Sequence, residues 1–329
     1  MIRLTRRASL LLTLGALLLR EPPGAAAPVI LANNPGGADA NFSQDDVLPS
    51  IAVVAGPYED LTIRASYSQT VARQTFKELT PIVQQEFLGG PIFVGDPTLG
   101  MSSLENYDLR FDYTPTPGSL FSASVFYKDI EDPIEYVQSG VLFTFTTPKN
   151  YEWGKLKGIE LEARQRMGDV VDALDGLTLG ANATFIDSET ELLAQEQQGL
   201  ANVGAPIVTR DMTNAPDHLY NLFATYEIKP TRTSFGVFYT VTGDSLVTGA
   251  GQVDQNFVPS IYQKEFDSLN VSVTQALGSI FTLKLQAKNL TNPYIEEVYR
   301  SEFTGPDATR SIYTKGIDYS ISLSAKLSF

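Results

Sequence analysis

The residue types that most often carry out chemistry are scarce in this chain. Its 329 residues include one histidine and no cysteine, so imidazole and thiolate chemistry have almost no positions open to them. His218, in the segment NAPDHLYN, has Ser and Asp residues nearby and could be imagined in a hydrolase. No nucleophile, base and orienting group near it follow the spacing of such a site. The sequence therefore predicts a protein that is not an enzyme and has no cofactor.

Three acidic residues form the best candidate for a metal site. Glu189, Glu191 and Glu196 lie close together in the sequence and could bind a divalent cation. They lack the ligand pattern of a calcium-binding loop. A solvated loop accounts for them more simply, and the sequence predicts no metal site.

Charged residues recur at alternate positions in several segments. They could line a transport path, or they could form ion pairs that hold neighbouring strands in register, and the second interpretation is favoured. These residues are Arg64, Asp108, Arg110, Asp112, Glu160, Glu162, Arg164, Lys284 and Lys288.

Five residues outside the alternating segments are candidates for contact with a small-molecule ligand. All have charged or hydrogen-bonding side chains in segments that are expected to be loops, where binding residues concentrate. They are Arg73, Glu78, Asp96, Asp211 and Tyr262.

The segments that must position these residues show a strict period of two. In the closing segment GIDYSISLSAKLSF, apolar and polar residues alternate up to Phe329, which predicts a strand with one apolar and one polar face. The segment exceeds the roughly 9 to 11 residues that a tilted strand needs to cross a bilayer. Similar segments predict about eleven strands, around residues 51–55, 61–67, 107–113, 121–127, 159–163, 177–185, 220–228, 235–241, 269–273, 281–287 and 317–329.

The segments between these strands alternate in length. Short turns are expected at residues 55–60, 114–118, 167–176, 229–233 and 276–279, and long connections at 70–103, 129–150, 188–217, 242–264 and 290–315. Transmembrane β-barrels alternate in this way because one rim has tight turns and the other has long loops. Tyr67, Tyr107 and Tyr127 lie near strand ends, as in the aromatic girdles of such barrels, although aromatic pairs in a soluble sheet would give the same pattern.

The N-terminal segment differs from the rest of the chain. Residues 1–28 contain arginines, then an apolar run, then small residues, which is the order of a secretory signal peptide. Residues 29–46 are polar and are expected to be a linker, and residues 47–329 form the predicted barrel. The net charge of −14 argues against nucleic acid as a partner.

The barrel segment resembles the TonB-dependent receptors of bacterial outer membranes. The segments LTIRASYSQTVARQTFKELTP, NYDLRFDYTPTPGSLFSASVFYKDIEDPI, KLKGIELEAR, NAPDHLYNLFATYE, LQAKNLTNPY and YSISLSAKLSF are similar to successive landmarks of that family, in the same order. The resemblance implies an energy-dependent importer with about 22 strands around a plug. It also implies that the last strand is read by the barrel assembly machinery, through Tyr319, Ile321, Leu323, Leu327 and Phe329.

The expected architecture departs from that family in one respect. Eleven strands are half of the family's barrel and an odd number, whereas complete bacterial barrels have an even number. The stretch between Pro28 and Asp46 leaves no room for a plug or for a segment that contacts TonB. We therefore expect an all-β antiparallel transmembrane barrel that is the C-terminal half of a larger receptor and lacks its plug.

The function expected from the resemblance is uptake of a scarce nutrient across the outer membrane. The ligand could be a siderophore, a vitamin or a saccharide, and the expected partners are outer-membrane lipid, the barrel assembly machinery and, in an intact homologue, TonB. Two alternatives remain: a passive pore without a plug, and a secreted all-β binding protein.

Overall fold

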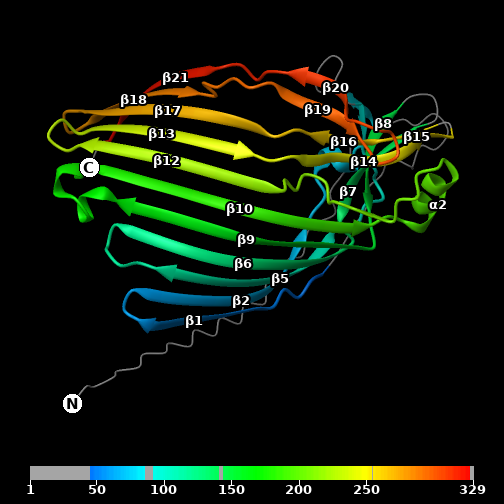
Figure 1. The fold of residues 1–329 in the computed structure, drawn as a ribbon, viewed down its shortest axis with the longest axis horizontal. Coiled ribbons are helices and arrows are strands. Elements are labelled where there is room, and N and C mark those ends of the chain that lie inside the picture. The colour runs from blue at the N-terminus through cyan, green and yellow to red at the C-terminus, as the bar shows by residue number, and fades with distance from the viewer. Residues whose placement is uncertain (1–44, 86–91, 141–143, 254, 327–329) are drawn as a thin grey trace.

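The computed structural model describes residues 45–85, 92–140, 144–253 and 255–326. The expected signal peptide and most of the expected linker at residues 29–46 lie outside these ranges. The described residues form two β-sheets, which we call the wall and the apical sheet (Figure 1).

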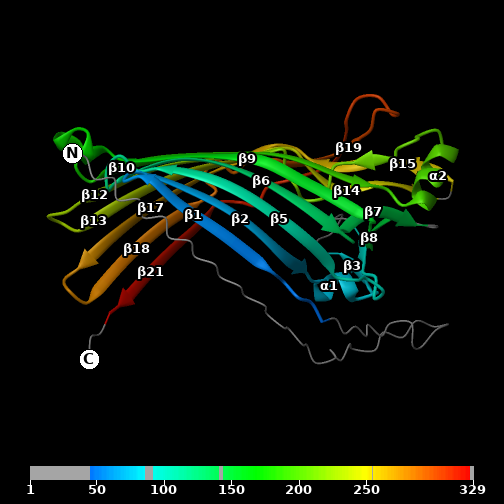
Figure 2. The same cartoon turned by 90° about the horizontal axis from the view of Figure 1, so that it is seen from below.

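The wall is a curved antiparallel sheet in which each long strand pairs with the next long strand of the chain (Figure 2). Eleven strands form its path, and these are the eleven strands that the alternating segments predict. In order they are β1 (Ser50–Tyr58), β2 (Leu61–Ala72), β5 (Ser102–Tyr113), β6 (Ser119–Glu131), β9 (Trp153–Arg166), β10 (Leu177–Glu191), β12 (His218–Ile228), β13 (Thr233–Thr242), β17 (Phe266–Leu277), β18 (Phe281–Lys288) and β21 (Asp318–Ala325). The short strand β11 (Thr209–Arg210) pairs with β10 beside this path.

The apolar face of the wall is exposed. Phe111, Val125, Leu161, Phe185 and Leu222 are each between 42% and 52% exposed, although they occupy the positions that a soluble sheet would bury. On the opposite face even small polar side chains are shielded by their neighbours: Asp112 is 5% exposed and Ser122 is 9% exposed. Side chains converge on the concave face of a curved sheet, so the polar residues line its inside.

The wall does not close on itself among the described residues. β1 and β21 form its two edges and do not pair with each other. Because every step along the path is antiparallel and the path has eleven strands, β1 and β21 run in the same direction. On β21, three of the predicted assembly-signal residues, Tyr319, Ile321 and Leu323, are 63% to 77% exposed on the apolar face. Leu327 and Phe329 lie outside the described residues.

The long connections are not the loops that the sequence suggests, because they contain strands that assemble into the apical sheet. This sheet lies at one end of the wall (Figure 1), and its order runs β20-β19-β16-β14-β7-β8-β4-β3, with β15 paired to β14. The strands are β3 (Val83–Gln85), β4 (Ile92–Val94), β7 (Ile134–Gly140), β8 (Phe145–Asn150), β14 (Ser245–Val253), β15 (Asn256–Val258), β16 (Ser260–Gln263), β19 (Ile295–Arg300) and β20 (Ala308–Tyr313).

The buried apolar side chains lie almost entirely in these connections. Among the described residues, thirteen of the fourteen buried hydrophobic side chains belong to segments between wall strands, Ile130 of β6 being the exception. Tyr151, Leu192 and Leu200 form a cluster, and Leu193, Ile207 and Phe257 pack against it. Helix α2 (Ala194–Asn202) supplies Leu200 to that cluster. The apical sheet is therefore the part of the molecule that has an ordinary hydrophobic core.

Helices are short and sit in the connections and turns. They are α1 (Phe76–Leu79), α2, and the two 3₁₀ turns Met167–Asp169 and Asp172–Leu174, which lie in the short turn between β9 and β10. None of the helices in the described part of the chain has the length and apolar character needed to cross a membrane.

Candidate functional site

The polar face of the wall carries a chain of ion pairs. Arg64 of β2 pairs with Asp112 of β5, whose other oxygen accepts a hydrogen bond from Arg110 Nε at 2.8 Å. Arg110 Nη2 lies 3.0 Å from a carboxylate oxygen of Glu162 on β9. These contacts join four of the charged residues for which the sequence favours ion pairing, and in that respect the structure agrees with the sequence.

The arginine at the centre of this chain reaches over an intervening strand. β5 and β9 are separated by β6, which places Ser122 opposite both Asp112 and Glu162. A serine side chain is short enough for Arg110 to pass above it. The small residues of β6 therefore allow one guanidinium to connect strands that are not neighbours, and each such partly exposed pair contributes about 0.2 to 1 kcal/mol.

A second polar arrangement lies at the junction of the wall and the apical sheet, around Arg210. The side chains of Arg210 and Glu135 are 6% and 2% exposed, and Arg210 Nη1 lies 2.8 Å from Glu135 Oε2. The same carboxylate oxygen accepts the backbone N–H of Thr213 at 2.8 Å. The guanidinium also lies over the ring of Tyr151, with its central carbon 5.1 Å from the ring centroid. Burial by itself disfavours the charged form, but the nearby Glu135 carboxylate raises the pKa of Arg210 above its ordinary value.

Two of the predicted ligand contacts meet next to this pair. Tyr262 of β16 donates a hydrogen bond of 3.1 Å from its hydroxyl to Asp211 Oδ2. Burial and the adjacent Asp211 carboxylate raise the pKa of the Tyr262 hydroxyl, so it acts as a donor at any physiological pH. Asp211 also lines a hollow of about 440 Å³, together with Lys155, Lys157 and Asp187.

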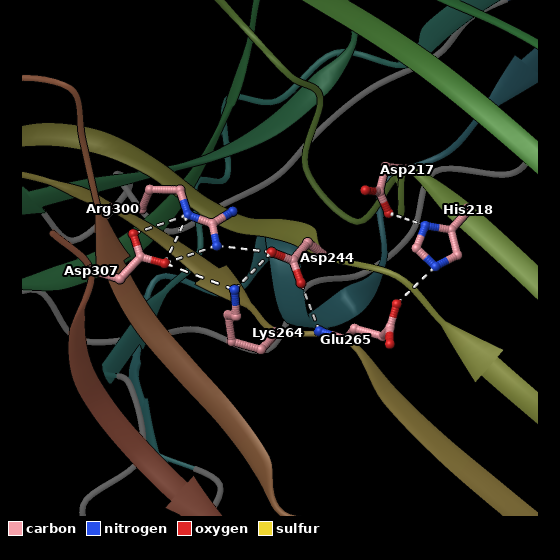
Figure 3. A network of polar contacts seen from close by, with 7 residues as sticks. All are labelled: Asp217, His218, Asp244, Lys264, Glu265, Arg300 and Asp307. Atoms are coloured by element: carbon pink, nitrogen blue, oxygen red, sulfur yellow. Dashed lines mark hydrogen bonds and ion pairs between the residues drawn. The ribbon is translucent and has the colours of Figure 1, made fainter.

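Beside Tyr262 lies a cluster of ion pairs that spans the last two long connections (Figure 3). Arg300 Nη2 lies 2.8 Å from Asp244 and 2.9 Å from Asp307, and Lys264 Nζ lies 3.3 Å from Asp244. Asp244 also accepts the backbone N–H of Glu265 at 2.7 Å. The Arg300 guanidinium covers the Tyr262 ring at 4.6 Å. This cluster links β16, β19 and the β13–β14 turn.

The single histidine is held between two carboxylates. His218 Nδ1 lies 2.9 Å from Asp217 and Nε2 lies 3.0 Å from Glu265. Figure 3 shows the ring between these two carboxylates. Its ring stacks on Tyr220 at 4.6 Å. Because both ring nitrogens face carboxylates, the imidazole connects the first residue of β12 to Glu265, which directly precedes β17. It is not poised to activate a serine hydroxyl, which would need one nitrogen for the nucleophile.

The other three predicted ligand contacts lie apart from Asp211 and Tyr262. Glu78 is 8% exposed, accepts a hydrogen bond of 2.8 Å from the Tyr136 hydroxyl, and forms a capping box with Thr75 at the start of α1. Asp96 accepts hydrogen bonds from the backbone and hydroxyl of Thr98 in a turn after β4. Arg73 follows β2 directly and is exposed.

The acidic residues that could have formed a metal site are separated. Glu191 accepts a hydrogen bond of 2.8 Å from Trp153 Nε1. Glu196, on α2, accepts hydrogen bonds from Lys149 and from the Tyr151 hydroxyl. Glu189 and Glu191 belong to strand β10, so the expectation of a loop there was wrong. Within the ranges that the structure describes, no group of three or more possible ligands could hold a metal ion.

Sequence reasoning missed the residues that organise the apical sheet. Glu135, Arg210, Asp244 and Arg300 lie in segments without a period, and each finds its partner in a different long connection. The sequence did contain one indication of these strands, which is the presence of Val, Leu and Tyr in β7 and β14, residues that are uncommon in solvated loops.

The fold and its exposed apolar face define the class of protein, which is an antiparallel β-barrel wall with polar residues inside and extended connections at one end. The chain belongs to the family described as TonB dependent receptor-like, beta-barrel, whose model matches residues 30–290. The resemblance that the sequence segments indicate is thus confirmed. A search of curated proteins found no match.

Solved structures show the same fold at low sequence identity. The FrpB iron transporter from Neisseria meningitidis (F3-3 variant) matches with a TM-score of 0.52 and 15% identity, over 86% of this chain and 38% of its own. A mutant of the ferric enterobactin receptor PfeA from Pseudomonas aeruginosa matches with a TM-score of 0.54 and 15% identity, over 85% of this chain and 40% of its own. The copper transporter OprC matches with a TM-score of 0.57 and 12% identity, over 87% of this chain and 41% of its own. This chain therefore spans about two fifths of the length of these proteins.

Proposed function

We propose that this chain forms part of the wall and mouth of an outer-membrane receptor of the TonB-dependent type, which takes up a small molecule. The observation that carries the proposal is the inverted wall. Its apolar side chains are about two fifths to one half exposed on one face, and ion pairs join Arg64, Asp112, Arg110 and Glu162 on the other. Water would penalise that exposed face, whereas the hydrocarbon of a bilayer matches it.

The apical sheet supports the second half of the proposal. Its residues Tyr262 and Arg300 lie beside Asp211, which follows β11, at one end of the wall, where a ligand would arrive. The relatives in fold are named as an iron transporter, a ferric enterobactin receptor and a copper transporter, which favours a scarce small nutrient as the ligand. Proposed partners are outer-membrane lipid, the barrel assembly machinery acting on β21, and TonB as the energy source of an intact receptor.

Because the chain has no cysteine, single introduced cysteines give a direct test of orientation. Leu222 is 52% exposed on the apolar face of β12, and its neighbour Asn221 lies on the polar face. In bacterial outer membranes, we expect Asn221→Cys to react with a small water-soluble maleimide and Leu222→Cys to react only after detergent solubilisation. Equal labelling of both before solubilisation would show that water reaches both faces and would contradict a membrane wall.

Refolding into detergent gives a second test. A closed barrel resists SDS until it is boiled, so a difference in gel migration between the unboiled and boiled protein would show that the wall closes in detergent, and identical migration would show that it stays open. Purified protein is then added to a planar bilayer. Steady ion conductance without any ligand would favour the passive pore, and partition into buffer without detergent would favour the secreted binding protein.

A further inference from the structure

The polar face of the wall changes character along the sheet. From β2 to β9 it carries the ion pairs around Arg110 and one phenyl ring, Phe126, which lies over Gly158, whereas on β10, β12 and β13 it carries amides, hydroxyls, two glycines and two phenyl rings. Aromatic side chains are unexpected on the face that lines the inside. Phe223 and Phe238 are opposite each other in register on β12 and β13, with Phe238 40% exposed.

Each of the two rings occupies the space that a neighbouring glycine leaves free. Gly180 of β10 is opposite Phe223, and a Cβ built on Gly180 would overlap the Phe223 ring. A Cβ on Gly236 would come within 2.8 Å of Phe238. The ring centroids are 6.2 Å apart and the ring planes are 25° from parallel, so the two rings form one apolar patch.

A line of neutral hydrogen-bonding groups runs beside these rings. Asn221 Nδ2 donates to Asn182 Oδ1 at 2.8 Å, and Thr240 Oγ1 donates to Asn221 Oδ1 at 2.8 Å. Asn221 and Thr240 are two residues from Phe223 and Phe238 on the same face of the same strands. Because these contacts use only part of the capacity of two amides and a hydroxyl, the line retains donors and acceptors for a ligand.

An apolar patch of two phenyl rings beside neutral donors and acceptors matches the chemistry of a sugar ring. The C–H face of a pyranose can pack on a phenyl ring while its hydroxyls reach amide and hydroxyl groups at the edge. An anionic ligand would find no cation among these five side chains, although Arg164 borders them where it pairs with Gly180. A neutral ligand avoids the desolvation cost of a charge at this surface.

We propose that Phe223, Phe238, Asn182, Asn221 and Thr240 form a binding strip for a neutral saccharide on the inside of the wall. The strip deepens the proposed function, on which it rests, by naming the ligand class. Aromatic rings can also cover a glycine in a sheet for purely structural reasons. The test must therefore distinguish a phenyl ring that binds the saccharide from one that only covers a glycine of the sheet.

Leucine substitutions make that separation. Phe223→Leu and Phe238→Leu keep an apolar side chain over the glycines but remove the flat ring face. Phe235→Leu is the matched control, because Phe235 is also 40% exposed and lies on the same strand as Phe238 but on the apolar face. All four proteins are refolded into detergent and checked for heat-dependent migration before any binding measurement.

Binding of maltohexaose is then measured by isothermal titration calorimetry, with an oligogalacturonate of equal length as the charged comparison. We expect maltohexaose to bind the parent protein and the Phe235→Leu control alike, at least about fivefold more weakly to each inner variant, and oligogalacturonate to bind less well. A folded parent that does not bind maltohexaose, or equal losses in all three variants, overturns the saccharide strip and leaves the receptor proposal intact. A parent that remains soluble without detergent overturns both.

Discussion

The wall and the apical sheet are both built from β-strands, but they bury opposite kinds of side chain. In the wall, apolar side chains such as Leu161 and Leu222 are about half exposed, and the buried side chains include the polar Asp112 and Ser122. In the apical sheet, Val137, Leu246 and Ile295 are 1% to 2% exposed. The wall matches the apolar surroundings that we propose for it, whereas the apical sheet buries its apolar side chains as a sheet in water does.

That difference changes what holds each sheet together. The wall relies on continuous antiparallel ladders, up to thirteen register pairs between β9 and β10, and on ion pairs across its inside. The apical sheet has short and irregular ladders, including a parallel seam between β7 and β14. Its stability must come from its hydrophobic core and from buried pairs such as Arg210 with Glu135. Four substitutions or conditions test this division, from the largest expected effect to the smallest.

Removing one partner of the buried pair should damage the apical sheet most. Glu135→Ala leaves the Arg210 guanidinium buried without its counter-charge, which costs about 3 to 5 kcal/mol. We expect rapid proteolysis of the long connections while the SDS resistance of the wall is kept. Glu135→Gln retains a hydrogen-bond acceptor and should be less severe. Loss of SDS resistance in Glu135→Ala would show that the two sheets are one cooperative unit.

A cavity in the apical core should act in the same direction. Leu246 is 1% exposed on β14, and Leu246→Ala should cost about 2 to 5 kcal/mol through lost contacts and the residual cavity. The matched control is Leu222→Ala on the exposed face of the wall. Limited proteolysis should distinguish the two variants, and equal sensitivity would contradict the assignment of the core to the apical sheet.

A charge on the apolar face should damage only the wall. Leu222→Arg places a guanidinium where we propose hydrocarbon, at a cost of about 2 to 4 kcal/mol near the middle of the bilayer. Asn221→Arg, on the polar face of the same strand, is the control. Urea titration of the protein in lipid vesicles measures the loss of stability. A neutral effect of Leu222→Arg would argue that this face meets water.

Acid should weaken the ion-pair cluster of the apical sheet. The Arg300 guanidinium holds the pKa of Asp307 below its ordinary value, and Asp244, despite partial burial, is lowered by the same guanidinium. A carboxyl whose pKa is lower in the folded state stabilises that state at every pH above its pKa in the unfolded chain, which is near 3.8. This contribution is lost as the pH falls through the pKa of the folded state. We expect protease sensitivity near β19 to rise only when the pH falls below about 3.8. The rise should be smaller in Arg300→Gln, because the ion-pair cluster of that variant is already weakened at neutral pH.

Much of the wall could be predicted from the sequence. Alternation in segments such as 107–113 and 220–228 placed all eleven strands, because a strand with two different solvents on its faces must alternate. Tyr67, Tyr107 and Tyr127 were predicted near strand ends, and this was wrong for Tyr67 and Tyr107, because β2 and β5 continue for several residues beyond the alternating segments. The three rings lie side by side at tilted angles, with centroids 5.1 and 6.1 Å apart. Short local pairing between consecutive strands kept the topology simple.

The apical sheet and most of the site could not be predicted in this way. β7 pairs with β14 across more than one hundred residues of chain, and the parallel pairing leaves no local turn signal. Asp211 and Tyr262 were chosen as ligand contacts from residue type alone, and their hydrogen bond depends on two separate connections folding together. The ligand roles of all five predicted contacts stay predictions.

The sequence by itself determined the strands of the wall, their order and which face of each is apolar. These properties follow from local periodicity and from turns between neighbours in the chain. Only the tertiary structure decided that the long connections form a second sheet, that Arg210 is buried against Glu135, and that Phe223 and Phe238 lie together on the inside. Such contacts join residues far apart in the chain, and their stability depends on packing that no single segment contains.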